Sequence, residues 1–199
     1  MASSIALDGS SDLVVDFFEC SLYSILYLRG ILCPDDFVHQ KRFGTVVMWP
    51  VNLEVSAYVD QIIDQLRVWL KTNQVCEMIL LIKSKPDFEV VERWQFSIHV
   101  DGTNETKPNQ SDAKATSQIK AILRQIFASV SILPSLDGID CTYNVQVHVE
   151  PTAELPSAWK EESGPSLIAG GGEHVRLATL STDGRRIEPY ISYRMENPF

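Results

Sequence analysis

The chain has 199 residues, of which 45% are hydrophobic and 22% charged, and its formal net charge is −9. This length fits one ordinary domain with its own buried core, and the composition excludes a collagen-like, coiled-coil or wholly disordered chain. An acidic chain is also a poor electrostatic match for nucleic-acid phosphates or an anionic membrane, so we expect neither as a partner.

The first part of the chain predicts two amphipathic helices with a short strand between them. The first helix is capped at Ser10 or Ser11, exits at Gly30 and repeats apolar residues at helical spacing: Val14, Phe18, Leu22, Ile25 and Leu26. The β-branched run at residues 45–49 predicts a strand. The second helix carries the next apolar stripe: Val55, Val59, Ile62, Ile63, Leu66, Trp69 and Leu70.

The middle of the chain predicts a sheet covered by helices on one face. Residues 78–82 are apolar without interruption, which indicates a central strand buried on both faces. Residues 90–100 and 139–149 alternate between apolar and polar, as strands with one covered face do. The polar stretch 101–116 predicts a loop, and a third helix follows with a stripe from Ile119 to Val130 and a stop at Pro134. Helices and strands in this order predict an α+β fold.

The last 49 residues hold five of the ten prolines and five of the ten glycines. They also contain two strand-like runs, 175–180 and 190–193, with a hairpin signal at Asp183-Gly184 between them. The prolines should confine these strands to sheet edges. We therefore predict one domain over residues 1–199, with a core at about 9–150 and a pliable C-terminal segment at about 151–199.

No catalytic or metal-binding pattern stands out. The four histidines lack metal-ligand spacing, and the glycines at 170–172 precede Glu173 rather than the lysine of a phosphate loop. The cysteines Cys20, Cys33, Cys76 and Cys141 form no Cys-x-x-Cys clip, so we expect free thiols. The sequence thus favours a binding module over an enzyme, with no cofactor and no metal. A sheet edge could accept another chain's strand, or the C-terminal segment could simply be a hairpin that completes the sheet.

Six segments of the chain form recognisable motifs: Ser-Ile-Leu-Tyr-Leu-Arg-Gly-Ile at 24–31, Gln-Leu-Arg-Val-Trp-Leu at 65–70, Glu-Arg-Trp-Gln-Phe at 92–96, Ile-Leu-Arg-Gln-Ile at 122–126, Trp-Lys-Glu-Glu-Ser-Gly-Pro at 159–165 and Glu-His-Val-Arg-Leu at 173–177. These motifs resemble those of the HORMA-domain family, within it the branch of spindle assembly checkpoint proteins. They occur in the family's order and span nearly the whole chain.

The resemblance implies a fold of three helices packed on an antiparallel sheet, with a mobile C-terminal "safety belt" at roughly residues 156–195. In the family's open form the belt covers a sheet edge. In the closed form it moves across the sheet, and a partner peptide adds as a strand beneath it. The receiving edge here would be residues 141–149.

The resemblance also implies roles for particular residues. The peptide-binding set is Trp69, Tyr143, Val145, Val147 and Trp159. Arg124 and Gln125 match the surface through which open and closed conformers pair and an adaptor binds. The belt residues are Trp159, Ser163, Gly164, Pro165, Val175, Leu177, Tyr190 and Tyr193.

The function implied by the resemblance is to sequester the mitotic activator of the anaphase-promoting complex. Implied partners are a coiled-coil scaffold protein at kinetochores, checkpoint kinase-related proteins of the inhibitory complex, a HORMA-like adaptor with its AAA+ remodelling ATPase, and a second copy of the chain. The implied localisation is the nucleus, the kinetochore and the cytoplasm. The alternative within the family is the adaptor subunit of translesion DNA polymerase zeta, and the alternative outside it is a small enzyme.

Overall fold

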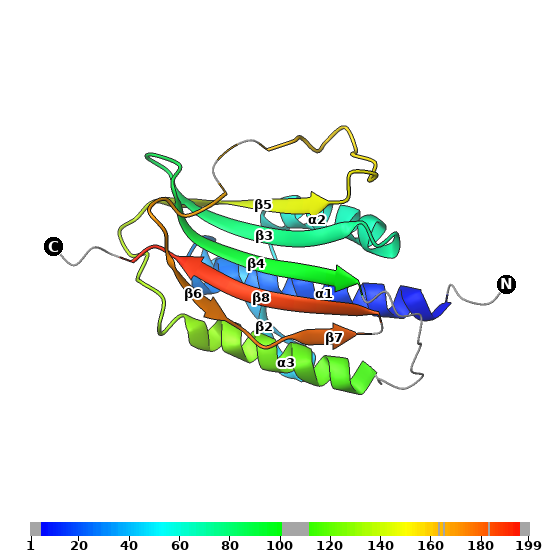
Figure 1. Ribbon diagram of the computed structural model, residues 1–199. Helices are drawn as coiled ribbons and strands as arrows, with labels where there is room; N and C mark the ends of the chain where they lie inside the picture. The colour runs from blue at the N-terminus through cyan, green and yellow to red at the C-terminus, as the bar shows by residue number, and fades with distance from the viewer. Residues whose placement is uncertain (1–4, 101–111, 163, 165, 183, 196–199) are drawn as a thin grey trace.

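The computed structural model describes residues 5–100, 112–162, 164, 166–182 and 184–195. Figure 1 labels the helices and strands, whose bounds are α1 Ile5–Leu28, a 3-10 turn Pro34–Asp36, β1 Phe37–Arg42, β2 Thr45–Pro50, α2 Leu53–Lys71, β3 Val75–Ser84, β4 Val90–Val100, α3 Asp112–Ser129, β5 Cys141–Val149, β6 Glu173–Arg176, β7 Leu180–Thr182 and β8 Arg185–Tyr193.

One antiparallel sheet forms the centre of the molecule, with strand order β5-β3-β4-β8-β6, and β7 also pairs with β8. Helices α1, α2 and α3 cover one face of this sheet, with α1 in contact with both of the others. The hairpin β1–β2 is a separate two-stranded sheet against α1. The predicted α+β architecture of three helices on an antiparallel sheet is confirmed.

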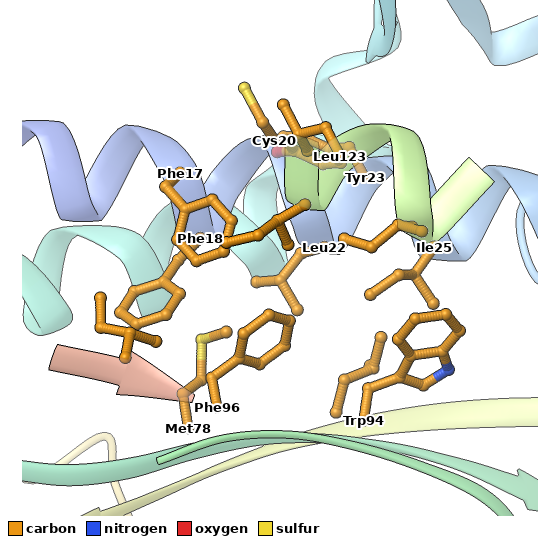
Figure 2. Packing of buried hydrophobic residues seen from close by; sticks show 14 of the residues in the cluster. Phe17, Phe18, Cys20, Leu22, Tyr23, Ile25, Met78, Trp94, Phe96 and Leu123 are labelled. Carbon is orange, nitrogen blue, oxygen red and sulfur yellow. The ribbon is translucent and has the colours of Figure 1, made fainter. Parts of the chain in front are cut away.

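The core lies between α1 and the two middle strands of the sheet. Figure 2 shows Phe17 and Phe18 of α1 pointing toward Phe96 of β4, and both rings meet Phe96 edge-on at centroid distances of 5.9 and 5.7 Å. Aromatic pairs in this geometry stabilise a core beyond the area they bury. The run 78–82 of β3 is fully buried between β4 and β5, so the prediction of a central strand is confirmed.

A buried ion pair ties α1 to the sheet. The Arg29 Nε donates to the Glu92 carboxylate at 2.9 Å, and its Nη2 donates to the Pro134 carbonyl at 2.6 Å. The Trp94 indole donates to the other Glu92 oxygen. Burial raises the pKa of Glu92, and the Arg29 charge opposes that rise. Arg29 and Glu92 belong to two of the segments that carry the family resemblance, and this contact joins those two segments in the core.

The structure differs from the sequence-based prediction at strand β1 and at the first residues of helices α1 and α3. The turn between β1 and β2 has Phe43 at φ 50° and Gly44 at φ 66°, the two left-handed residues of a tight hairpin. Phenylalanine is not a turn signal, so the hairpin was missed. Helix α1 begins at Ile5, before the predicted caps. Helix α3 begins at Asp112, so residues 112–116 of the predicted loop are helical.

Two further predictions for the C-terminal segment are wrong: the single strand at 175–180 and the confinement of its prolines to sheet edges. The predicted strand 175–180 is split into β6 and β7, and Pro189 lies in β8, which pairs on both sides. The Pro189 carbonyl accepts the Leu177 N–H at 3.0 Å, so the proline nitrogen faces the same side. The missing N–H therefore falls at the break between β6 and β7, and the β4–β8 ladder is unaffected. This is how a proline is tolerated away from the sheet edge. Asp183 of the predicted hairpin lies outside the described residues.

Glu19 lies in an unfavourable electrostatic position on α1. Burial raises the pKa of its carboxyl to about 7, against the lowering effect of Arg42 and Arg67 and with a further rise from Asp16 and Asp60. A folded-state pKa above the unfolded value of 4.5 means that the native state holds its proton more tightly. Stability is therefore lost as pH rises from about 4.5 to about 7, where ionisation of Glu19 disfavours the folded state.

Glu19→Gln should stabilise the chain above neutral pH and not in acid. We expect a gain of about 1 kcal/mol in unfolding free energy at pH 8, because partial water contact screens the full penalty. The gain should shrink toward zero near pH 4.5, which denaturant titrations at the two pH values will measure. Glu161→Gln, at an exposed position, is the matched control. If the gain in unfolding free energy were the same at both pH values, ionisation of Glu19 would not destabilise the folded chain.

Candidate functional site

The outer edge of β5 has no strand partner among the described residues. β5 pairs with β3 on one side, and on the other side the Val145 N–H donates to the Tyr58 hydroxyl of α2 at 3.3 Å. Main-chain groups alternate along an antiparallel strand. The N–H and C=O groups of Tyr143, Val145 and Val147 therefore point outward. They are the groups with which an added strand would pair.

A groove of about 1180 Å³ runs along this edge. Helix α2 forms one wall, β5 the second, and the segment 150–162 the third. Its apolar lining includes three large side chains that remain exposed: Tyr58 at 41%, Val68 at 56% and Leu155 at 50%. Its charged lining has four carboxylates, one lysine and one histidine: Asp64, Glu150, Glu161, Glu162, Lys160 and His148. The groove thus suits an extended chain with aliphatic side chains and positive charge.

Two tryptophans hold the third wall against α2. The Trp69 indole N–H donates to the Glu154 carbonyl at 3.1 Å. Its ring meets the Trp159 ring edge-on, with centroids 4.8 Å apart. The Trp159 N–H in turn donates to the Pro156 carbonyl at 2.9 Å. These contacts fix residues 154–159 at the C-terminal end of α2, so Trp69 serves the core and the groove at once.

The connection from β5 to β6 surrounds the receiving edge. In Figure 1 it leaves the end of β5, runs back along the outer side of that strand and then turns toward β6 on the opposite side of the sheet. Ile168 packs on Ile79, Leu81 and Val90 on the helix-free face. At Gly172 a Cβ would lie 2.6 Å from the Tyr193 carbonyl oxygen, so only glycine fits. This close approach gives one of the glycines at 170–172 a packing role.

The structure places most of the predicted peptide-binding residues around the groove. Trp69, Val145, Val147 and Trp159 line it. Tyr143 lies beside it, with its ring edge-on to Tyr58 at 5.6 Å, and burial raises the pKa of its hydroxyl. The sequence analysis did not single out the exposed apolar residues of the lining, Tyr58, Val68 and Leu155. Tyr58 and Val68 lie outside the apolar stripe of α2, and an exposed aromatic residue there was the available signal.

The predicted conformer interface is on the exposed face of α3. Both Arg124 and Gln125 are exposed. The Gln125 side-chain oxygen also accepts the Ala178 N–H at 2.6 Å, in the segment between β6 and β7. Gln125 therefore contacts the C-terminal segment directly, which the sequence did not indicate.

The predicted belt residues fall in two places. Trp159 and Gly164 lie in the connection, and the Gly164 N–H donates to the Glu162 carboxylate at 2.8 Å. Four others belong to the C-terminal strands or the break between them: Val175, Leu177, Tyr190 and Tyr193. The Tyr193 hydroxyl donates to Glu173 at 3.2 Å. Ser163 and Pro165 lie outside the described residues.

Within the described ranges, no group of histidine, cysteine and acidic side chains is placed to hold a metal ion. The four cysteines are free. Of the helices that the structure describes, none is long and apolar enough to cross a membrane.

The chain is similar to known proteins over almost its whole length. The HORMA domain model matches residues 10–183. The mitotic spindle checkpoint component mad2 of Schizosaccharomyces pombe is 34% identical, over 98% of this chain and 97% of that protein. The mitotic spindle assembly checkpoint protein MAD2A of Homo sapiens is 32% identical, over 96% of this chain and 93% of that protein.

A solved structure supports the same assignment. A chain of the mitotic checkpoint complex crystal structure superposes with a TM-score of 0.84 and 34% identity, over 94% of this chain and 100% of that one. The relatives named here are checkpoint proteins, so the polymerase-adaptor alternative is not favoured. The chain belongs to the HORMA domain family, among its mitotic spindle checkpoint members.

Proposed function

We propose that this chain acts in the spindle assembly checkpoint by trapping a partner peptide as an added strand on β5. The observation that carries the proposal is the edge of β5, which has no strand partner in the part of the chain that the structure describes, opens into a groove of about 1180 Å³ and is bordered by the connection to β6. Main-chain pairing supplies affinity in this mode of binding, and side-chain pockets supply specificity. The connection adds a topological barrier, because a peptide beneath it cannot leave sideways.

The position of β8 decides whether this edge is free. Here β8 pairs with β4, on the far side of β3 from β5. A C-terminal segment placed on β5 instead would cover the receiving edge. The chain would therefore alternate between a covered form and a peptide-competent form, and the described arrangement corresponds to the second. Conversion breaks many hydrogen bonds of about 1 kcal/mol each, so exchange between the forms should be slow.

The partners follow from this mechanism. The trapped peptide belongs to the mitotic activator of the anaphase-promoting complex or to a coiled-coil kinetochore scaffold protein. The complex with the activator also contains checkpoint kinase-related proteins, and an adaptor with an AAA+ ATPase reopens the closed form. The chain acts by binding rather than catalysis, in the nucleus, at kinetochores and in the cytoplasm.

Val147→Pro tests strand addition directly. Proline removes an outward N–H of β5 but none that pairs with β3, so the fold should remain. Loss of one hydrogen bond, about 1 kcal/mol, should raise the Kd for a peptide of the activator roughly fivefold. Isothermal titration calorimetry measures this, with circular dichroism on the same samples. Val147→Ala keeps the N–H and is the matched control. Equal affinities for the proline and alanine variants would rule out main-chain pairing at this residue.

Trp159→Ala should loosen the third wall of the groove. It removes the edge-on contact with Trp69, worth about 1 kcal/mol beyond the buried area, and the core remains intact. We expect peptide dissociation to accelerate roughly tenfold with little change in association, because interface changes act mainly on the off-rate. Surface plasmon resonance provides both rates, and Ser157→Ala, in the same segment and exposed, is the control. An unchanged off-rate would mean that the tryptophan pair does not retain the peptide.

Arg124→Glu tests the conformer interface on α3. The side chain is exposed, so folding stability should change by at most about 0.5 kcal/mol. Reversal of its charge should abolish self-association and leave peptide binding intact. Sedimentation velocity measures the dimer fraction, with Lys114→Glu on the exposed surface of the same helix as the control. A dimer fraction equal to that of the parent chain would exclude Arg124 from the interface.

A further inference from the structure

Arg185, the first residue of β8, is a buried cation with an unusual set of partners. Its exposed fraction is 2%. Among the residues that the structure describes, none of its contacts is an ion pair with a carboxylate; its partners are neutral oxygens. Burial lowers the pKa of its guanidinium, but an arginine side chain stays charged in proteins. A buried charge without a counter-ion must have its donors satisfied in another way.

The partners of Arg185 come from two helices distant in sequence. Nη1 donates to the Ser11 hydroxyl of α1 at 3.1 Å. Nη2 donates to the Leu70 carbonyl at 2.5 Å and to the Asn73 side-chain oxygen at 2.6 Å, and Nε reaches the same Asn73 oxygen at 3.1 Å. One side chain thus connects the start of β8 to α1 and to the C-terminal end of α2.

The C-terminal end of α2 is a suitable receptor for this cation. Leu70 is one of the last residues of the helix, and its carbonyl accepts the Asn73 N–H at 3.1 Å in the turn that ends the helix. A carbonyl oxygen has two lone pairs, so the same oxygen can also accept from Arg185. The end of a helix also carries the negative pole of its dipole, which favours a positive charge. Asn73 has φ 54° and completes the turn after the helix, so its side chain is held beside Leu70. Together the Leu70 carbonyl and the Asn73 side-chain oxygen present two acceptors to the guanidinium.

Arg185 also stands where the C-terminal hairpin turns. It pairs with Thr182 of β7 on one side and with Val100 of β4 on the other. A slip of one residue in β8 would turn the arginine to the opposite face of the sheet. Its docking between α1 and α2 therefore defines the register of β8 as well as its place.

We propose that Arg185 is the positioning residue that anchors the C-terminal hairpin beside β4, and so keeps the β5 edge free for a partner strand. The contacts with Ser11, Leu70 and Asn73 exist only in this arrangement, so they favour it over any in which the hairpin lies elsewhere. The effect on peptide binding rests on the function proposed above. The anchoring of the hairpin does not depend on it.

The test uses the full chain and four variants. Arg185→Ala removes the donors, and Arg185→Lys keeps the charge but cannot present a planar fork to three acceptors. Asn73→Gly removes the shared acceptor and retains a residue that tolerates positive φ. Arg186→Lys is the matched control, since Arg186 is the neighbouring residue of the same type with an exposed side chain paired to Glu188.

Hydrogen–deuterium exchange of the peptides covering β7 and β8 is the first readout. We expect at least tenfold faster exchange there in Arg185→Lys and Asn73→Gly, with the α1 core still protected and Arg186→Lys equal to the parent chain. If Arg185→Ala does not fold, the lysine and Asn73 variants decide. Exchange at parental rates in both of them would overturn the proposal.

Dissociation of a bound activator peptide, by surface plasmon resonance, is the second readout. It should accelerate at least fivefold in Arg185→Lys and stay unchanged in Arg186→Lys. If the peptide dissociates from the parent chain and from Arg185→Lys at the same rate, the proposed effect of Arg185 on the β5 edge is overturned. If the parent chain binds no peptide while β8 still loosens in the variants, the proposed function fails and the anchor stands.

Discussion

The pairing of β8 with β4 is the contact on which the rest of the structure depends. A sheet core of β5, β3 and β4 has two edges, and the single C-terminal segment can extend only one of them. Because β8 takes the β4 edge, the β5 edge keeps outward N–H and C=O groups without a strand partner among the described residues. Exposed edges of this kind are normally protected, since they pair readily with other chains. Here the edge is enclosed by α2 and the connection, so access is limited to a chain that can enter the groove.

Two buried arginines join the layers, and each does so by matching donors to fixed acceptors. Arg29 connects α1 to the Glu92 carboxylate of β4 and to the turn after α3. Arg185 connects the start of β8 to α1 and the end of α2, and its partners among the described residues are neutral oxygens. Removal of either arginine leaves buried acceptors without their donor, which is more costly than loss of an exposed pair. The first contact belongs to the permanent core, and the second to a segment that the proposed mechanism requires to move.

The groove shows how one helix can serve both packing and recognition. The inward side of α2 fills the core with Ile62, Ile63 and Leu66, while Tyr58 and Val68 face the groove. Trp69 lies at the boundary, buried yet bonded to the connection through its indole N–H. Because the same helix end also receives Arg185, the peptide site and the C-terminal anchor share one rigid support.

The sequence by itself determined the class of fold, the three helices and the central strand, because apolar periodicity is a local property. The spacing of its histidines, cysteines and glycines also matched no evident catalytic pattern. Four residues that the family resemblance singled out, Trp69, Val145, Val147 and Trp159, line one groove in the structure. The sequence did not reveal β1, the split of 175–180 or the interior position of Pro189, which depend on turn geometry and on partners far along the chain. Nor could it decide which edge of the sheet β8 would extend. That choice lies in contacts between residues more than a hundred positions apart, such as Arg185 with Leu70 and Asn73, and only the tertiary structure brings them together.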